Sequence, residues 1–354
     1  MAKKATGTTA YAVGVDLGGT FIKAGVVNAA GRVSRQVSRP TEVEKGREAI
    51  LANIVGAADD AVRAAGLSWA DVRGLGLGSP GIFDYEKGGV VHLCPNLKPL
   101  EGHPLTTLTA AALGRSNVSV VLENDANAAA FGELWAGVGA TGRGAERPSH
   151  AQRRGAKHVA GVRSLVLFTL GTGIGGGIVL NGEVWHGANG FAGELGHQTI
   201  LPDGPKCGCG NRGCLEMMAS APGLVRRLNA AIEAGKRSSL AKRVRAGEHV
   251  TAKDIHAAAV AGDALARALM EETGTFLGIA AANMMNCLDP EMVVFGGGMT
   301  AAGNMLLTPI RAEAKRRAIP AVYHGCRIVF AKLGNNAGLI GAAGCALKAS
   351  GISA

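Results

Sequence analysis

Residues 10–27 read AYAVGVDLGGTFIKAGVV, and residues 164–182 read SLVLFTLGTGIGGGIVLNG. In both stretches an apolar run typical of a β-strand stops at a glycine-rich turn and then resumes, which is the pattern of a hairpin. The turn DLGGT at residues 16–20 thus returns as LGTGIG at residues 170–175, 154 positions later. This repetition predicts a duplicated α/β unit with one glycine turn in each half.

Further strands and helices are expected around each hairpin. In the first half these are a helix over residues 42–65, strands at 72–77 and 119–122, and an alanine-rich helix from residue 126. In the second half they are a returning strand at 178–185, helices at 251–261, 264–288, 301–318 and 337–349, and strands at 292–295 and 327–331. The alternation predicts two α/β lobes that close on a nucleotide.

The composition is that of a folded, two-domain protein. The chain has 354 residues, of which 47% are hydrophobic, so it is long enough for two domains and apolar enough for sizeable cores. It contains 54 glycines, about twice the usual share. Because no Gly-X-Y period accompanies this excess, we attribute it to turns, close packing and approach of the backbone to ligands.

The net charge of +10 comes from two short segments. Residues 141–163 hold six basic residues and one acidic residue, and residues 236–245 hold five basic residues and no acidic one. Each segment therefore contributes +5, and the rest of the chain is balanced. No aromatic residues interleave these charges, which disfavours nucleic-acid binding.

The cysteine pattern and the hydropathy indicate a cytoplasmic protein. The seven cysteines are odd in number and three of them are bunched within residues 207–214, which favours a reducing compartment over a secreted disulfide framework. No signal peptide is recognised before residue 16. The longest uncharged stretch, residues 164–182, is rich in glycine and contains polar residues, so we expect a strand–turn–strand there and no membrane span.

The two glycine turns are candidate phosphate sites. Phosphate binding needs converging backbone N–H groups without obstructing side chains, and each turn also supplies a threonine hydroxyl. The same glycines would equally serve a plain hairpin, and no Walker loop is present. Asp16, at the end of the first strand, is placed to hold a divalent metal directly or through water. The candidate phosphate ligands are Gly18, Gly19, Thr20, Gly171, Thr172 and Gly173.

The segment Glu123-Asn124-Asp125 follows an apolar strand and opens a helix. Asn124 or Asp125 could simply cap that helix. Alternatively, the carboxyl end of a strand is where α/β proteins place their sites. A carboxylate there could accept a hydroxyl proton as the oxygen attacks phosphorus. The spacing alone leaves both interpretations open.

His197 and the segment CGCGNRGC at residues 207–214 form the strongest single motif. One imidazole and three thiolates are a closed tetrahedral set suited to Zn²⁺. The alternatives, a disulfide or unligated thiols, are disfavoured by the reducing compartment. Because protein side chains fill all four positions, we predict a structural Zn²⁺ held by His197, Cys207, Cys209 and Cys214. The scattered cysteines are expected to be core residues, namely Cys94, Cys287, Cys326 and Cys345.

Taken together and in this order, the motifs resemble those of the ROK family of sugar kinases and repressors, and most closely its bacterial glucokinase branch. They are Asp16-Leu-Gly-Gly-Thr20, Glu123-Asn-Asp125, LGTGIGG at 170–176, Glu194-Leu-Gly-His197 and Cys207-x-Cys209-Gly-x-x-Gly-Cys214-x-Glu216. The resemblance runs from about residue 11 through the remainder of the chain. It implies a two-lobed, actin-like (ribonuclease H-like) α/β fold with the ligand cleft between the lobes. A small lobe of residues 1–130, completed by residues 337–354, would precede a large lobe of residues 131–336 with the zinc loop.

The resemblance also implies an activity, which is ATP-dependent phosphorylation of D-glucose at O6 with Mg²⁺ accompanying the ATP. Asp125 would be the catalytic base. The sugar would be bound by Gly81, Asn96, Asn124, Glu194, His197 and Glu216. ATP would be bound by Asp16 and the two glycine turns, together with Gly297 and Gly298. The family further implies a homo-oligomer, either a dimer or a tetramer.

Three departures from the family pattern qualify these implications. Only about ten residues precede the first strand, where repressors of the family carry a helix-turn-helix, so DNA binding is not expected. The segment Asn96-Leu-Lys-Pro-Leu100 lacks an aromatic residue common in the family, which leaves another hexose or N-acetylhexosamine (N-acetylmannosamine or fructose foremost) as an alternative substrate. A sugar-sensing regulator without turnover is the alternative of a different class. The basic stretch 141–163 is interpreted as a solvated loop, or else as a contact for polyphosphate as donor.

Overall fold

The computed structural model describes residues 10–140 and 161–352. Most of the basic stretch 141–163, and with it the expected anion contact, lies outside the described residues. The chain divides into two compact units, Met1–Gly144 with Asn181–Ala192 and Asn335–Ala354, and Ala145–Leu180 with Gly193–Gly334. Among the helices of the described ranges, none combines the length and the apolar character that a membrane crossing requires.

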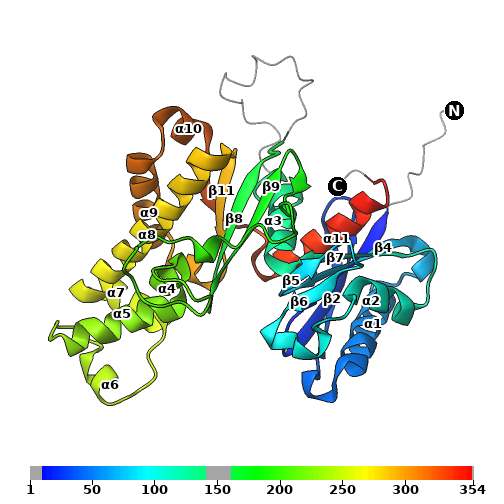
Figure 1. The fold of residues 1–354 in the computed structure, drawn as a ribbon, viewed down its shortest axis with the longest axis horizontal. Coiled ribbons are helices and arrows are strands. Elements are labelled where there is room, and N and C mark those ends of the chain that lie inside the picture. Colours follow the sequence, from blue (N-terminus) through cyan, green and yellow to red (C-terminus); the bar gives the residue numbers. More distant parts are fainter. Residues whose placement is uncertain (1–9, 141–160, 353–354) are drawn as a thin grey trace. The chain divides into compact units, whose positions relative to one another are not determined.

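The first unit contains a five-stranded mixed sheet of order β3-β2-β1-β4-β7 (Figure 1). Its first three strands are an antiparallel meander, whereas β4 and β7 run parallel to β1. The strands are β1 (Tyr11–Leu17), β2 (Phe21–Asn28), β3 (Val33–Pro40), β4 (Val72–Ser79) and β7 (Ser119–Asn124). A separate hairpin pairs β5 (Ile82–Asp84) with β6 (Val90–Leu93).

The second sheet repeats the topology of the first, with the order β10-β9-β8-β11-β12. Here β8 pairs antiparallel with β9 and parallel with β11, which in turn pairs parallel with β12. The strands are β8 (Leu165–Leu170), β9 (Ile174–Leu180), β10 (Glu183–Val184), β11 (Met292–Gly296) and β12 (Arg327–Phe330). The predicted α/β class and the predicted duplication are therefore confirmed.

The returning strand of the second half begins earlier than the sequence predicts. We expected it at residues 178–185, but β9 covers Ile174–Leu180 and includes three consecutive glycines that pair with β8. Glycine usually weakens a strand, and in strands it often marks a close approach of other groups. A Cβ on Gly176 would lie 2.4 Å from Leu195 Cγ, so a packed side chain occupies that space.

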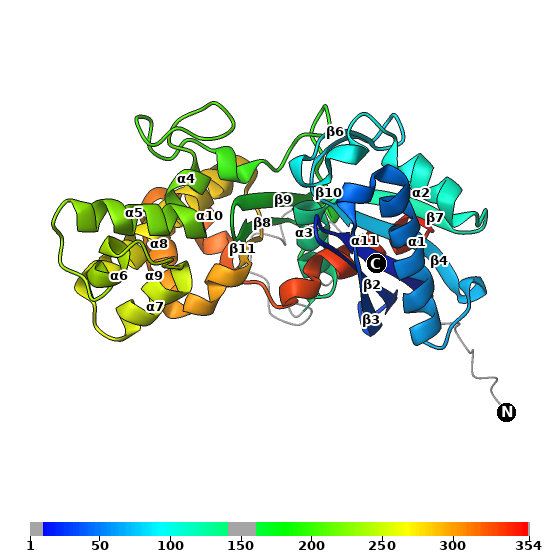
Figure 2. The same ribbon diagram turned by 90° about the horizontal axis from the view of Figure 1, so that it is seen from below.

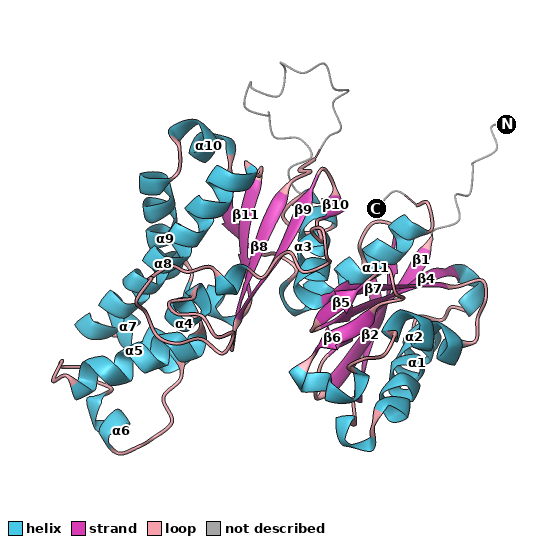
Figure 3. Ribbon diagram, viewed as in Figure 1, coloured by secondary structure: helices cyan, strands magenta, loops and turns pink. Residues whose placement is uncertain are grey.

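The helices of each unit pack against its sheet or against one another (Figure 3). In the first unit they are α1 (Arg47–Ala64), α2 (Leu105–Leu113), α3 (Asp125–Trp135) and α11 (Ala337–Ala349). In the second unit they are α4 (Leu215–Ala219), α5 (Ala221–Glu233), α6 (Ala241–Arg245), α7 (Ala252–Val260), α8 (Ala264–Leu288), α9 (Asn304–Arg317) and α10 (Pro320–Gly325). The predicted bounds of 264–288 and 337–349 coincide with α8 and α11.

The two faces of the first sheet are packed in different ways. Leu75 and Leu77 of β4 point to the face covered by α1 and join a buried aliphatic cluster. Gly76, between them, points to the opposite face, where a Cβ would lie 1.8 Å from the carbonyl oxygen of Ala342 in α11. Likewise, a Cβ on Gly14 of β1 would lie 2.0 Å from the carbonyl oxygen of Leu339 in α11. Helix α11 thus packs backbone against backbone, which accounts for part of the glycine excess.

The core of the second unit forms around its long helix α8, which packs closely against α9 (Figure 2). The rings of Phe168 in β8 and Phe295 in β11 stack with centroids 5.2 Å apart and are fully buried. Asp263 caps α8 by accepting a hydrogen bond from the N–H of Ala266 at 3.0 Å. This buried framework holds the ends of β8 and β11, from which the second glycine turn and residues 297–298 extend.

Candidate functional site

The first glycine turn connects β1 to β2 and is fixed by its own hydrogen bonds. The N–H of Gly18 donates to Phe21 O at 3.0 Å, and the hydroxyl of Thr41 donates to Gly18 O at 2.7 Å. A Cβ on Gly19 would lie 3.1 Å from Asn96 Cβ. The structure therefore brings the turn against Asn96, which the resemblance assigns to the sugar.

Asp16 lies at the end of β1, opposite Lys23 on β2, whose Nζ is 3.9 Å from Asp16 Oδ2. Burial raises the pKa of Asp16, and the positive charge of Lys23 opposes that rise. At the start of α11, a Cβ on Gly338 would lie 3.9 Å from Asp16 Oδ1 and 3.8 Å from Asp125 O. Asp16 and Asp125 thus lie beside the same helix start.

At the junction of β7 and α3, helix capping and the candidate base fall on different residues. Asn124 is the N-cap, with Oδ1 accepting hydrogen bonds from the N–H groups of Ala126 at 2.9 Å and Asn127 at 3.2 Å. Its Nδ2 donates to Gly81 O at 3.1 Å, which brings those two predicted sugar ligands together. Asp125 is the first residue of α3 and is not needed as its cap.

Glu123 is a further residue of this junction, for which no individual role is predicted from the sequence. It is 4% exposed, and its carboxylate accepts hydrogen bonds from Tyr85, His186 and Asn127 as well as from the backbone N–H of Asn124. The one sign of such a role in the sequence was a charged residue directly after the apolar run at residues 119–122. The partners themselves could not be predicted, because His186 is 63 positions away in the sequence.

The second glycine turn lies against Glu216. The N–H of Gly171 donates to Gly173 O at 3.0 Å, which closes the turn between β8 and β9. Glu216, two residues after the last predicted zinc ligand, accepts a hydrogen bond from the N–H of Ile174 at 2.9 Å. A Cβ on Gly173 would lie 2.4 Å from Glu216 Oε2. A predicted sugar ligand and a predicted phosphate turn are therefore in direct contact.

Residues 297 and 298, predicted to lie near the adenosine, follow the end of β11. Gly297 has φ +92°, and a Cβ there would lie 2.3 Å from the carbonyl oxygen of Leu170, directly before the second glycine turn. The two glycine turns, Asp125 and residues 297–298 therefore follow the carboxyl ends of β1, β8, β7 and β11. This is where α/β folds commonly bind ligands.

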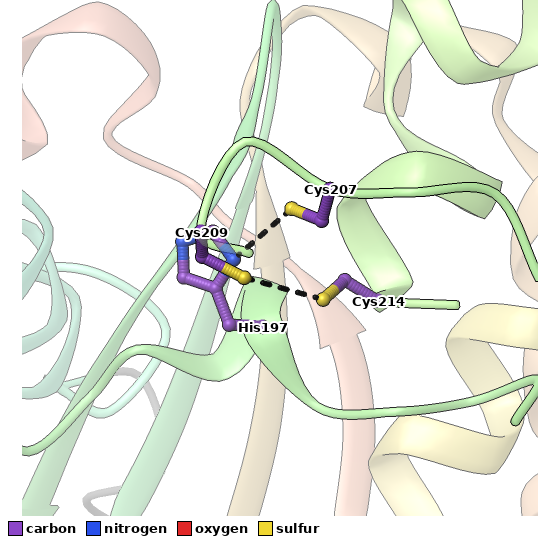
Figure 4. A group of neighbouring side chains, drawn as sticks. All are labelled: His197, Cys207, Cys209 and Cys214. Carbon is purple, nitrogen blue, oxygen red and sulfur yellow. Dashed lines mark hydrogen bonds between the residues drawn. The ribbon is translucent and has the colours of Figure 1, made fainter. Parts of the chain in front are cut away.

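The four predicted zinc ligands form one cluster (Figure 4). Their ligand atoms all lie within 4.8 Å of one another, with Cys209 Sγ 3.7 Å from Cys214 Sγ and His197 Nδ1 3.6 Å from Cys207 Sγ. A tetrahedral Zn²⁺ with Zn–S of about 2.3 Å and Zn–N of about 2.0 Å would place two sulfurs about 3.8 Å apart and nitrogen and sulfur about 3.5 Å apart. The observed separations fit a structural zinc site.

The imidazole of His197 has one nitrogen toward this cluster and the other toward a predicted sugar ligand. Nδ1 faces Cys207, whereas Nε2 is 3.8 Å from Glu194 Oε2. The Glu194 side chain is 53% exposed, so it is accessible to a polar ligand. This arrangement is compatible with the dual role of His197 that the family resemblance implies.

The four cysteines outside the cluster do not all match the expectation of core residues. Cys94 and Cys326 are buried and Cys345 is half-buried. Cys287 is exposed, so the prediction is wrong for this residue. It lies near the end of α8, where the helix turns one face to solvent, and its apolar neighbours in the sequence belong to the opposite face.

Comparison with known proteins identifies the family of the chain. The ROK family model matches residues 12–143 and 154–349. The glucokinase of Halalkalibacterium halodurans is 38% identical over 330 residues, which are 93% of this chain and 92% of that protein.

Solved structures share the fold as well. A ROK glucokinase from Streptomyces griseus, in complex with glucose and AMPPNP, is 33% identical with a TM-score of 0.68 and coverage of 96% and 99% of the two chains. A ROK transcriptional regulator, a homologue of the E. coli MLC protein, is 28% identical with a TM-score of 0.76, covering 96% of this chain and 78% of that one. Because kinase and regulator both share the two-lobed, actin-like fold found here, the fold alone does not distinguish them. On the extent of the family match and of the identity to the glucokinase, the chain belongs to the ROK family.

Proposed function

We propose that this ROK protein is an ATP-dependent kinase that transfers the γ-phosphoryl group to O6 of D-glucose. The observation that carries the proposal is Asp125, a carboxylate at the carboxyl end of β7 that helix capping does not require. The identity to a bacterial glucokinase over nine-tenths of the chain supports glucose as substrate. A regulator that only senses sugar has no need of a base at this position.

The proposed mechanism depends on positioning and on charge neutralisation. Asp125 accepts the proton of the 6-hydroxyl group as that oxygen forms a bond to the γ-phosphorus and the bond to the ADP oxygen breaks. Backbone N–H groups of the two glycine turns bind the phosphates, with Gly297 and Gly298 near the adenosine. Asp16 would hold Mg²⁺, which when bound neutralises charge on the phosphate oxygens.

The remaining polar residues bind and orient the sugar. The residues proposed to contact its hydroxyl groups are Gly81, Asn96, Asn124, Glu194, His197 and Glu216. His197 would use Nε2 for the sugar, because its Nδ1 faces the thiols. The zinc would keep the loops of Glu194 and Glu216 in place, so that little ordering entropy is lost when the sugar binds.

The proposal is tested by a coupled assay of phosphoryl transfer to glucose, mannose, fructose, N-acetylglucosamine and N-acetylmannosamine. Mg-ATP and polyphosphate are compared as donors. A preference for glucose in kcat/KM of about a hundredfold, or roughly 2.7 kcal/mol, would support a glucokinase. Preference for an N-acetylated sugar would keep the mechanism and change the substrate. Binding of glucose without turnover of any sugar would contradict the kinase assignment and favour a sugar sensor.

Gly173→Ala is expected to raise the KM for sugar by about tenfold and to change kcat less. The new Cβ would meet Glu216 Oε2 at 2.4 Å and displace the carboxylate from its contact with the second glycine turn. Steady-state kinetics at saturating Mg-ATP measure the effect. Gly325→Ala is the control, because nothing lies within 4 Å of a Cβ at that position. An unchanged KM for sugar in Gly173→Ala would argue against Glu216 as a sugar ligand.

A further inference from the structure

Glu123 is a buried carboxylate directly before the proposed sugar ligand and base. Glu123 is only 4% exposed to solvent. Oε1 accepts hydrogen bonds from Tyr85 Oη at 3.0 Å, Asn127 Nδ2 at 3.2 Å and the Asn124 N–H at 2.9 Å. Oε2 accepts one from His186 Nε2 at 2.7 Å. Four donors therefore converge on one side chain, and these hydrogen bonds offset the cost of burying a carboxylate.

These donors come from segments of the first unit that are far apart in the sequence. Tyr85 follows β5, His186 follows β10, and Asn127 lies in the first turn of α3. The rings of Tyr85 and His186 also pack on each other, with centroids 4.4 Å apart. Glu123 thus ties the β5–β6 hairpin and the segment after β10 to the start of α3.

The pairing of Glu123 with His186 has an electrostatic basis. Burial alone would lower the pKa of His186, but the hydrogen bond and the negative charge of Glu123 outweigh it, so the pKa is raised. Burial and Glu123 also raise the pKa of Tyr85, which keeps its hydroxyl proton as donor. Tyr85 and His186 line a pocket of about 420 Å³, whose other ionisable groups are Asp84, Glu86 and His92. The half-buried Cys345 also lies near Glu123.

We propose that Glu123, held by His186 and Tyr85, is a positioning residue for Asn124 and Asp125 in phosphoryl transfer. This inference rests on the proposed kinase function. Glu123 binds the N–H of Asn124, and Asn124 in turn caps α3 and holds Gly81. Asn124, directly before Asp125, is therefore held through both its backbone N–H and its side chain. Misplacement of a reacting group by about 1 Å can cost a hundredfold in rate.

Three variants of the full chain test the proposal. Glu123→Ala removes the acceptor of all four donors and is expected to lower kcat by about a hundredfold. Glu123→Gln keeps one acceptor oxygen and should recover part of that loss, to about tenfold below wild type. Tyr85→Phe removes one donor and should cost about threefold. The KM values for sugar and ATP should stay within about threefold in Glu123→Gln and Tyr85→Phe, because no binding group is removed.

Glu133→Gln is the matched control, since Glu133 is a fully buried carboxylate at the other end of α3. It should lower the melting temperature as Glu123→Gln does, while kcat stays within about twofold of wild type. As a second readout, NMR follows the titration of the His186 imidazole. Its signals are assigned by comparison with the His186→Gln variant. In wild type the imidazole should remain protonated to higher pH than in Glu123→Gln.

The outcomes separate this inference from the proposed function. If wild type turns over sugar and folded Glu123→Gln has an unchanged kcat, the positioning role is wrong and the kinase assignment stands. If His186 titrates identically in wild type and Glu123→Gln, the pair is not formed and the inference is likewise overturned. If wild type phosphorylates no sugar, the proposed function fails, and the positioning role fails with it. If Glu123→Ala does not fold, the kcat values of Glu123→Gln and Tyr85→Phe decide whether the positioning role holds.

Discussion

Asp125→Asn should lower kcat for glucose by about 10³-fold or more while the dissociation constant for glucose stays within about threefold of wild type. The amide cannot take the proton of the 6-hydroxyl group, so a contribution of about 4 kcal/mol to the barrier is lost. The fold should be retained. Asn124 is the N-cap of α3, and the contact of Asp125 Oδ1 with the N–H of Ala126 at 2.8 Å is available to an amide oxygen.

The measurement combines the coupled assay with calorimetric titration of glucose into both proteins. Asp289→Asn is the control, because Asp289 is an exposed residue with φ +46° at the end of α8, where asparagine is well tolerated. Turnover by Asp125→Asn close to wild type would show that another group accepts the proton. Loss of glucose binding along with turnover would show that the carboxylate binds substrate instead.

Cys214→Ser should remove the zinc and, with it, most of the activity and stability. Cys214 is fully buried and directly precedes α4, which carries Glu216. Structural zinc sites contribute about 10–16 kcal/mol of binding free energy in zinc-finger peptides. This is comparable to the whole typical stability of a domain, about 5–15 kcal/mol. We expect zinc to fall from about one ion per chain to nearly none.

Metal analysis, thermal unfolding and the kinase assay together test this expectation. Cys287→Ser is the matched control, because it makes the same substitution at an exposed cysteine outside the cluster. Removal of the metal from wild type with a chelator should reproduce the effect, and added Zn²⁺ should reverse it in wild type alone. A zinc-free protein with unchanged melting temperature and activity would contradict a structural role for the metal.

Much of the fold could be predicted because its signals are local. The hairpin turns depend on glycines next to apolar runs, and α8 and α11 have an apolar period long enough to give their bounds. The zinc ligands lie close together in the sequence apart from His197. By contrast, β3 has mostly exposed side chains and little apolar alternation, as is common for the edge strand of a sheet. Sequence periodicity therefore gave no sign of it.

The candidate site was less accessible to sequence reasoning because its contacts are long-range. The glycine turns, Asp125 and residues 297–298 follow the carboxyl ends of strands, whereas most other predicted ligands come from loops and short helices. The individual roles of all these residues remain predictions. The tie between Glu123, Tyr85 and His186 joins three segments that only the folded chain brings together. Likewise, the contact of Gly173 with Glu216 spans more than forty positions. Such pairings depend on how the strands and loops are arranged in space and leave no pattern in a single sequence.

The backbone-to-backbone packing of α11 also bears on how the protein is made in the cell. The strands of the first sheet are complete once β7 has left the ribosome, but the helix that covers their glycine-lined face is encoded about 200 residues later. At a synthesis rate of roughly 5–20 residues per second, that face stays uncovered for about 10–40 s. The second unit, whose last residue is Gly334, can therefore finish folding before the first unit is complete.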